Sequence, residues 1–173
     1  RRVLSQEMLS DRFLGYVNRE ADIRQVLKLA RSNGIRVALF GAAEAWRLAE
    51  TLASDKVPVF IDALDDLPSS FDQLGATENN AALLQRAGVS VSFYNGNDAS
   101  HNARKVRQIA GNAVADGLPW QDGLAGITSA PAKALGVDAR IGSIEVGKTA
   151  DLLRAAGEPT RNTRFVAGVR FWF

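Results

Sequence analysis

Short apolar runs alternate with stretches of helical periodicity over the first two thirds of the chain. Four runs of five or six residues are typical of buried strands, at residues 13–17, 35–40, 57–61 and 89–94. After the first run, Ile23, Val26, Leu27 and Ala30 stand at the i, i+3, i+4 and i+7 spacing of an amphipathic helix. Further helices are predicted through residues 45–52, 81–87 and 102–116.

This alternation predicts an α/β fold with a parallel sheet, because successive parallel strands are joined by right-handed helical crossovers. Asn18 is placed to cap the first helix, and Gly34 to end it in a left-handed turn. In such sheets the functional groups gather at the carboxyl ends of the strands. Those ends fall at residues 16–18, 41–44, 62–66 and 95–101.

The alternation of predicted strands and helices ends in the last third of the chain. Pro119 and Pro131 each stand near the start of a short predicted helix. Beyond residue 140 the pattern predicts short extended segments at 143–146, 151–154 and 165–172. We therefore expect two parts, β-α units with their following helices over residues 1–140 and a small β appendage over residues 141–173.

The composition is that of an ordinary globular protein, with 46% hydrophobic and 23% charged residues among 173. A net charge of +2 gives no reason to expect a nucleic-acid partner. The absence of cysteine rules out disulfides, thiolate nucleophiles and Cys-ligated metals. No apolar run approaches the roughly 18–20 residues that span a bilayer, so we expect a soluble cytoplasmic or periplasmic protein without a membrane partner. The start at Arg1, with neither Met nor signal peptide, leads us to expect a fragment of a longer protein.

Residues 142–149 match the phosphate-loop pattern G-x-x-x-x-G-K-[ST]. A phosphate loop needs an apolar strand before it and a helix N-terminus directly after it. The preceding residues 137–141 are too polar for a central strand, and Ile144 and Val146 alternate with polar residues as in a strand. A nucleotide-binding protein therefore remains the less favoured alternative.

Extended to Leu152, the same stretch resembles the G-S-[LI]-E-x-G-K-x-A-D-[LIF] signature of the amidohydrolase superfamily of metal-dependent hydrolases. Residues 118–124, 127–128 and 131–136 are similar to the helices that precede this signature in that superfamily. Further segments resemble its imidazolonepropionase-like branch, namely residues 17–23, 44–46, 67–72 and 101–104. In this order and spacing the matches cover nearly the whole chain.

The resemblance implies a (β/α)8 TIM barrel that carries a composite β-sandwich built from both chain ends. Residues 1–140 would hold the last four β-α units of the barrel and the following helices, and residues 141–173 the second part of the sandwich. In this reading the signature is structural, with Ile144 and Leu152 facing the sandwich core.

The resemblance also implies a divalent metal, zinc, manganese or iron, at the mouth of the barrel. The usual ligands are an H-x-H pair on the first strand, a carboxylated Lys or Glu on the fourth, His on the fifth and sixth, and Asp on the eighth. The metal lowers the pKa of a bound water and polarises a substrate carbonyl. The first four strands, and hence the H-x-H pair and the fourth-strand ligand, are not in this chain.

The remaining ligand positions depart from the family pattern. Tyr16 stands where the fifth-strand His is expected, and Ala43 where the sixth-strand His is expected. A phenol and a methyl group cannot replace two imidazoles as zinc ligands. Asp98 is the best match for the eighth-strand Asp, as metal ligand and proton-transfer residue. The substrate-binding residues that we predict are Tyr16, Asn18, Asn95 and His101.

Several other polar residues have both a functional and a structural interpretation. His101 is the only histidine, a ligand or proton carrier on one view and a solvated or capping side chain on the other. Glu44 is either a base or a carboxylate at a helix N-terminus. The acidic group Asp62, Asp65 and Asp66 could bind a hard cation, although a solvated acidic loop is favoured.

The arginines near the end of the chain alternate loosely with aromatic residues, a pattern also found in nucleic-acid-binding proteins. We favour a half-buried strand of the appendage instead. The residues concerned are Arg161, Arg164 and Arg170 with Phe165, Phe171 and Trp172.

The favoured hypothesis is the C-terminal half of a hydrolase that uses metal-assisted water attack on a C–N bond of a small cyclic amide or amide. The alternative is a catalytically silent binding protein that keeps the amidohydrolase fold. In both cases the partner is a small molecule and no nucleic acid. Because half a barrel leaves two open strand edges, we also expect a homo-oligomer or pairing with the missing half.

Overall fold

The structure, a computed structural model, describes residues 12–65, 67–96, 104–149, 152–153 and 166–167. Four parallel strands form a sheet in the order β1-β2-β3-β4. They are β1 (Arg12–Val17), β2 (Arg36–Gly41), β3 (Val59–Ile61) and β4 (Val91–Phe93). The predicted α/β fold with a parallel sheet is therefore confirmed.

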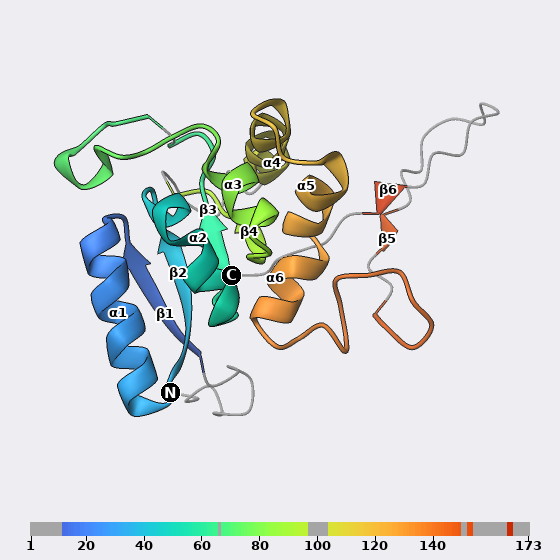
Figure 1. Cartoon of the computed structure of the whole chain (residues 1–173). Helices are drawn as coiled ribbons and strands as arrows, with labels where there is room; N and C mark the ends of the chain where they lie inside the picture. Colours follow the sequence, from blue (N-terminus) through green and yellow to red (C-terminus); the bar gives the residue numbers. More distant parts are fainter. Residues whose placement is uncertain (1–11, 66, 97–103, 150–151, 154–165, 168–173) are drawn as a thin grey trace, which may run out of the picture.

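Helices follow each strand, as the apolar periodicity predicts. Figure 1 shows α1 beside β1 at one end of the sheet, and α4, α5 and α6 beyond β4 at the other. The helical segments are α1 (Glu20–Asn33), the 3-10 helix η1 (Ala45–Leu48), α2 (Ala49–Ser54), the 3-10 helix η2 (Phe71–Gln73), α3 (Asn80–Arg86), α4 (Val106–Ala115), α5 (Trp120–Gly126) and α6 (Ser129–Ala134). No helix among these described segments is both long and apolar enough to cross a membrane.

One face of the sheet is buried under the helices. Alternate strand residues such as Val37, Leu39 and Val59 point to this face and join one large apolar cluster. Helix α1 contributes Ile23 and Leu27, which are 0% and 3% exposed, from the stripe that its sequence spacing predicts. This cluster fixes where each strand ends, and so it positions the polar residues that follow.

The other face of the sheet is only partly covered. Ala38 and Phe60 contact Ala134 near the end of α6, with Phe40 and Tyr94 packed beside them. The rings of Phe40 and Phe60 stack in parallel with their centroids 4.3 Å apart. Toward the β1 edge, Tyr16 is 63% exposed, so this face of the sheet is left open there.

The start of α1 differs from the prediction. Arg19, and not Asn18, occupies the N-cap position, and it makes no side-chain capping hydrogen bond. Asn18 is instead tied to the end of β2, because its carbonyl accepts a hydrogen bond from the Glu44 amide at 2.9 Å. The predicted end of the helix is confirmed, since Gly34 adopts φ 65° in the left-handed region.

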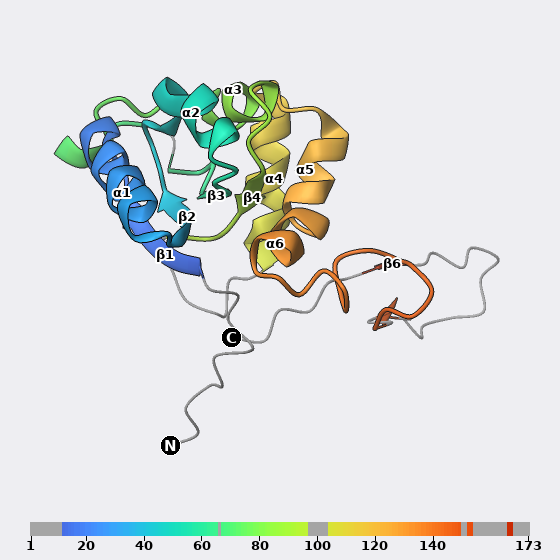
Figure 2. The same cartoon turned by 60° about the horizontal axis from the view of Figure 1, so that its bottom comes forward.

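The appendage also differs in part from the prediction. Residues 143–146 form bends and turns rather than a strand, and Ile144 is 82% exposed. The amides nearby bond locally, Lys148 to the Glu145 carbonyl and Thr149 to the Arg140 carbonyl. The antiparallel pair is formed only by β5 (Leu152–Leu153) and β6 (Val166–Ala167), which Figure 2 shows away from the main sheet. Within these residues Ile144 faces no sandwich core.

The segment 142–149 does not fit a phosphate-binding loop. The Lys148 ammonium donates to the Ser143 hydroxyl at 2.5 Å and pairs with the Glu145 carboxylate at 3.2 Å. Hydrogen bonding to the Glu145 carboxylate, by Ser143 first and then by Lys148, holds the pKa of Glu145 below its ordinary range. Strand β5, and no helix N-terminus, follows among the described residues. Lys148 thus binds side chains of its own turn, and the described residues provide no helix N-terminus whose dipole could bind a phosphate there.

Two helical glycines test the packing of α5 against β4. A Cβ at Gly126 would lie 2.6 Å from the Phe93 ring and 3.3 Å from the Val91 carbonyl, whereas a Cβ at Gly111 on α4 would meet nothing within 4 Å. We expect Gly126→Ala to destabilise the protein by about 1–3 kcal/mol through overpacking. The matched Gly111→Ala should stabilise it by about 0.5–1 kcal/mol. Urea unfolding of the full-length protein measures both, and equal effects of the two changes would contradict this packing.

The open edges of the sheet predict association. Strands β1 and β4 are the edges of the four-stranded sheet, so each has backbone groups without a strand partner among the described residues. We expect residues 1–173 on their own to sediment as a dimer or larger species, or to unfold without a cooperative transition. Analytical ultracentrifugation and thermal melting decide this. A monodisperse monomer with a sharp transition would show the prediction wrong.

Candidate functional site

The carboxyl ends of the four strands bring polar side chains to one edge of the sheet, as predicted. Tyr16 and Asn18 lie at the end of β1, Glu44 after β2, Asp62 after β3 and Tyr94 after β4. The ends of β1 and β2 are joined by a hydrogen bond from the Ala42 amide to the Val17 carbonyl at 2.7 Å. Asn95 follows Tyr94 and is half-buried. The predicted residues Asp98, His101 and Asp66 lie outside the described residues.

At Gly41, two side chains of β1 and the residue after it lie close to the backbone at the end of β2. It adopts φ 80°, and a Cβ there would lie 2.4 Å from the Asn18 Oδ1 and 3.2 Å from the Tyr16 ring. Only glycine allows both side chains to lie against the backbone of β2 in this way. The Asn18 Oδ1 is buried there and has no hydrogen-bond partner. Asn18 therefore packs between strand ends, while Tyr16 as a whole is 63% exposed.

Glu44 has a structural role. Its carboxylate accepts the Glu20 amide at 2.8 Å, which caps the start of α1, and the Gly75 amide at 3.1 Å. The Gly75 carbonyl in turn accepts the Trp46 indole N–H at 2.9 Å. An anion at a helix N-terminus is favourable, and both carboxylate oxygens are engaged. Of the two interpretations of Glu44, the structure supports the helix N-terminus rather than the base.

The acidic residues after β3 are likewise bonded to the protein. Asp62 is 5% exposed, and its two oxygens accept the Gly96 amide at 2.7 Å and the Leu64 amide at 3.1 Å. Asp65 accepts the Gln73 side-chain amide at 2.5 Å. Among the described residues no group of three His, Cys, Asp or Glu side chains could hold a metal ion. The described part of this loop therefore uses its carboxylates to fix the backbone.

Tyr94 is held in a polar, half-buried position above the aromatic stack. Its ring meets the Phe40 ring edge-on, with centroids 5.2 Å apart. A Cβ at Gly96 would lie 3.3 Å from the Tyr94 hydroxyl and 3.4 Å from the Asp62 Oδ2, so the three groups converge. Burial, followed by the Tyr16 hydroxyl and the Asp62 carboxylate, raises the pKa of Tyr94 well above its ordinary value of 10.0. Tyr94 is therefore a neutral hydroxyl at physiological pH.

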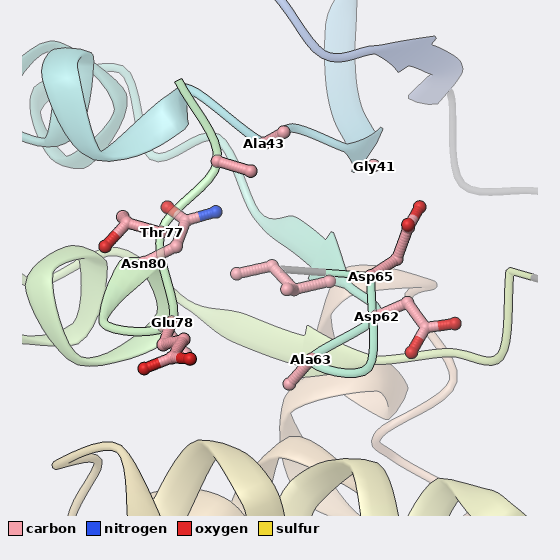
Figure 3. A pocket seen from close by; sticks show the side chains of 11 residues that line it. Gly41, Ala43, Asp62, Ala63, Asp65, Thr77, Glu78 and Asn80 are labelled. Atoms are coloured by element: carbon pink, nitrogen blue, oxygen red, sulfur yellow. The ribbon is translucent and has the colours of Figure 1, made fainter. Parts of the chain in front are cut away.

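A small cavity lies beside this edge. Figure 3 shows Asp62 and Asp65 on one side of it, and Thr77, Glu78 and Asn80 on the other. Its volume is about 20 Å³, which has room for about one water molecule and none for a substrate. Asn80 is 5% exposed, donates to the Ala42 carbonyl at 3.0 Å, and keeps its Oδ1 unpartnered. This cavity therefore cannot bind a substrate by itself.

The described residues do not fit the metal site that the family resemblance implies. Tyr16 lies near the end of β1 and Ala43 lies just after β2, and these are the residues that the sequence comparison places at the fifth- and sixth-strand ligand positions. Ala43 is 7% exposed and has no donor atom in its side chain. The buried carboxylate of this edge, Asp62, accepts hydrogen bonds from backbone amides with both of its oxygens. These residues therefore lack the donor set that a catalytic zinc needs.

Comparison with known proteins gives the family. The sequence profile of the Amidohydrolase family matches residues 14–168. The chain belongs to the amidohydrolase family. Members of this family are generally metal-dependent hydrolases. The comparison with curated proteins finds no match to this chain.

Solved structures give the same fold. An amidohydrolase from Thermotoga maritima MSB8 matches with a TM-score of 0.74 and 28% identity over 80% of this chain and 36% of that one. An adenosine deaminase from Xanthomonas campestris with bound zinc matches with a TM-score of 0.52 and 21% identity over 80% of this chain and 42% of its own. E. coli guanine deaminase matches with a TM-score of 0.55 and 18% identity over 79% and 35%. The chain thus spans less than half the length of these proteins, and it corresponds to a fragment of the amidohydrolase barrel.

Sequence reasoning missed Tyr94, the second hydroxyl of the site. Tyr94 has the pattern of the last apolar residue of a strand, and its place near Asp62 depends on the neighbouring strand rather than on its own sequence pattern. A usable signal was present, since the chain has only two tyrosines and both stand at carboxyl strand ends. The role of Gly41 was also missed, because the glycine belongs to no motif.

The raised pKa of Tyr94 predicts a loss of stability at alkaline pH. Above pH 10.0 the unfolded chain releases this proton while the folded protein keeps it, so stability falls as the pH rises. Because Tyr94 is partly exposed, the slope should stay below the limit of about 1.4 kcal/mol per pH unit. We expect Tyr94→Phe to show a shallower decline of Tm above that pH than the unchanged protein. Thermal melting at a series of alkaline pH values measures this, and identical slopes would contradict the assignment.

Proposed function

We propose that this chain is the C-terminal half of a hydrolase, of the imidazolonepropionase-like branch, that cleaves a C–N bond of a small cyclic amide. The observation that carries this proposal is the alignment of its β-α units with the Thermotoga amidohydrolase, at 28% identity and a TM-score of 0.74. The resemblance of residues 17–23, 44–46 and 67–72 to the branch supports the finer assignment.

In this proposal each described residue of the edge has a defined task. Glu44 and Asp62 hold the loops after β2 and β3 in place through backbone amides. Tyr16 and Tyr94 present hydroxyl groups to the substrate, with Asn18 packed behind Tyr16 and Asn95 beside Tyr94. Asp98 and His101, which follow this edge in sequence, are the proposed proton-transfer and substrate-binding residues. The half of the barrel outside this chain completes the site.

The proposed domain organisation follows the same resemblance. Residues 1–140 form the last four β-α units of the barrel with their following helices, and residues 141–173 the second part of a composite β-sandwich. The antiparallel pairing of β5 with β6 supports a separate β segment at this end of the chain. Pairing with the missing half of the barrel, or with a second copy, would cover the open edges of the sheet.

A second candidate function is a binding protein that keeps the barrel without its chemistry. Tyr16 and Ala43 in the two ligand positions favour it, because neither side chain can serve as a zinc ligand in place of an imidazole. The ligand would remain a small molecule bound at the same strand ends. The two candidates differ in metal content and in turnover.

Metal analysis of the full-length protein, together with an amide panel, separates these candidates. If the protein is a hydrolase of the proposed kind, we expect at least one equivalent of zinc, manganese or iron and turnover of a small cyclic amide. Less than one equivalent with no hydrolysis across the panel would reject the enzyme and leave the binding protein.

A matched pair of variants tests the assignment of the proton-transfer residue in an active preparation. We expect Asp98→Asn to lower kcat by about 100-fold or more, the usual contribution of a general acid or base. Asp138→Asn makes the same chemical change at an exposed position after α6 and should leave kcat unchanged. Equal activity of both variants would remove Asp98 from the mechanism.

A further inference from the structure

A groove lies at the amino ends of the strands, opposite the edge that carries the proposed substrate-binding residues. It is formed where α1 and α2 end and where β2 and β3 begin, at the lower end of the sheet in Figure 1. Its volume is about 430 Å³, within the range of about 300–1,000 Å³ that is usual for small-molecule sites. Its lining comes from residues 27–57 alone, so these walls need no part of a barrel outside this chain.

The floor of the groove is apolar. Leu27 and Ala30 of α1 and Val37 of β2 line it, and they are 3%, 7% and 6% exposed. All three belong to the main apolar cluster, so the core of the protein holds the floor in place. Ile35 also lines the groove and is 45% exposed, which leaves apolar surface for a ligand to cover.

The charged residues of the groove are mostly cations. Arg31, Arg36 and Lys56 line it together with one carboxylate, that of Asp55. The Arg31 Nε and Nη2 lie 2.9 and 2.6 Å from the same Asp55 Oδ2, so these two charges neutralise each other. Arg36 and Lys56 are exposed, and neither forms an ion pair with another described residue. Two positive charges therefore remain beside an apolar floor, where the attraction for an anion is strengthened.

The backbone at Lys56 gives an independent reason to assign a role to its side chain. Lys56 has φ 54°, in the left-handed region where glycine is unstrained and a lysine is not. A cation can be favoured at a helix C-terminus by the carbonyls there. At the end of α2, however, the carbonyls of Thr51, Leu52 and Ala53 already accept backbone amides at 2.9–3.1 Å. A strained residue without such a structural task is a reason to look for a ligand.

We propose that this groove binds a small organic carboxylate with an apolar body. Arg36 and Lys56 bind the carboxylate, because a guanidinium fork matches its two oxygens and an ammonium adds a second charge. Ile35 and the floor contact the apolar body. The site lies at the far end of the strands from the proposed substrate-binding residues, so it is separate from the proposed hydrolysis and does not depend on it.

Titration of the full-length protein with benzoate tests the groove, followed by ligand-observed NMR at low ionic strength. Benzamide has the same ring without the charge, and we expect it to bind at least about tenfold more weakly. Arg36→Gln should weaken benzoate binding about tenfold, the effect of losing a hydrogen bond to a charged group. Lys28→Gln removes a positive charge from an exposed position of α1 outside the groove, and it should leave the affinity unchanged.

Two further variants separate ligand binding from a structural role. Lys56→Gly should weaken benzoate binding by about threefold or more and yet raise Tm by a few degrees, because glycine relieves the left-handed backbone. A lysine that only stabilises the turn would give a lower Tm and an unchanged affinity. Asp55→Asn removes the one carboxylate that lines the groove and releases Arg31, so benzoate should bind about threefold more tightly. Cooperative melting of every variant shows that the fold is intact.

The results that would overturn the inference are distinct from those of the hydrolysis experiment, because benzoate is not an amide. Equal affinities for benzoate and benzamide overturn it, as do equal affinities of the unchanged protein and Arg36→Gln. Equal losses in Lys28→Gln and Arg36→Gln overturn it too, since benzoate would then respond only to overall charge. Displacement of benzoate by equimolar inorganic phosphate has the same meaning, because the apolar body would contribute nothing.

Discussion

The structure depends on the need of a parallel sheet to bury both of its faces. One face of this sheet is covered by helices, and its side chains form the main apolar cluster. The other face is covered only near α6 and is otherwise left to the Phe40–Phe60 stack and the hydroxyls above it. In a closed barrel this second face is the interior. The described residues leave this second face open toward the β1 edge, where Tyr16 is 63% exposed.

That end of the sheet divides its polar residues between two tasks. The carboxylates of Glu44 and Asp62 each accept two backbone amides, which fixes the loops after β2 and β3. A carboxylate with both oxygens engaged is a poor metal ligand and a poor base. Tyr16 and Tyr94 lie at the same strand ends, and they are the residues that we propose for contact with the substrate. The two carboxylates are used in this way because a buried backbone amide without a hydrogen-bond partner costs free energy.

The sequence predicted the order and direction of the strands because apolar runs and helical stripes are local signals. It also predicted which strand ends carry polar residues, including Tyr16, Asn18 and Asn95. The prediction failed where the structure depends on residues that are distant in the sequence. Asn18 has the chemistry of a helix cap, but the Glu44 carboxylate reaches the first amide of α1 from 24 residues away. Likewise, residues 143–146 alternate as a strand does, yet no neighbouring strand pairs with them among the described residues.

The same distinction explains why the chemistry was harder to predict than the fold. The sequence places Tyr16 and Ala43 where the family resemblance implies imidazole ligands, but it does not predict how Tyr16 packs. The structure adds that a Cβ at Gly41 would lie 3.2 Å from the Tyr16 ring, so a glycine at this point leaves room for the ring against the end of β2. Gly41 is distant from Tyr16 in the sequence and belongs to the neighbouring strand. The pattern of one strand therefore could not predict this contact, whereas the same pattern was enough to predict the strand itself.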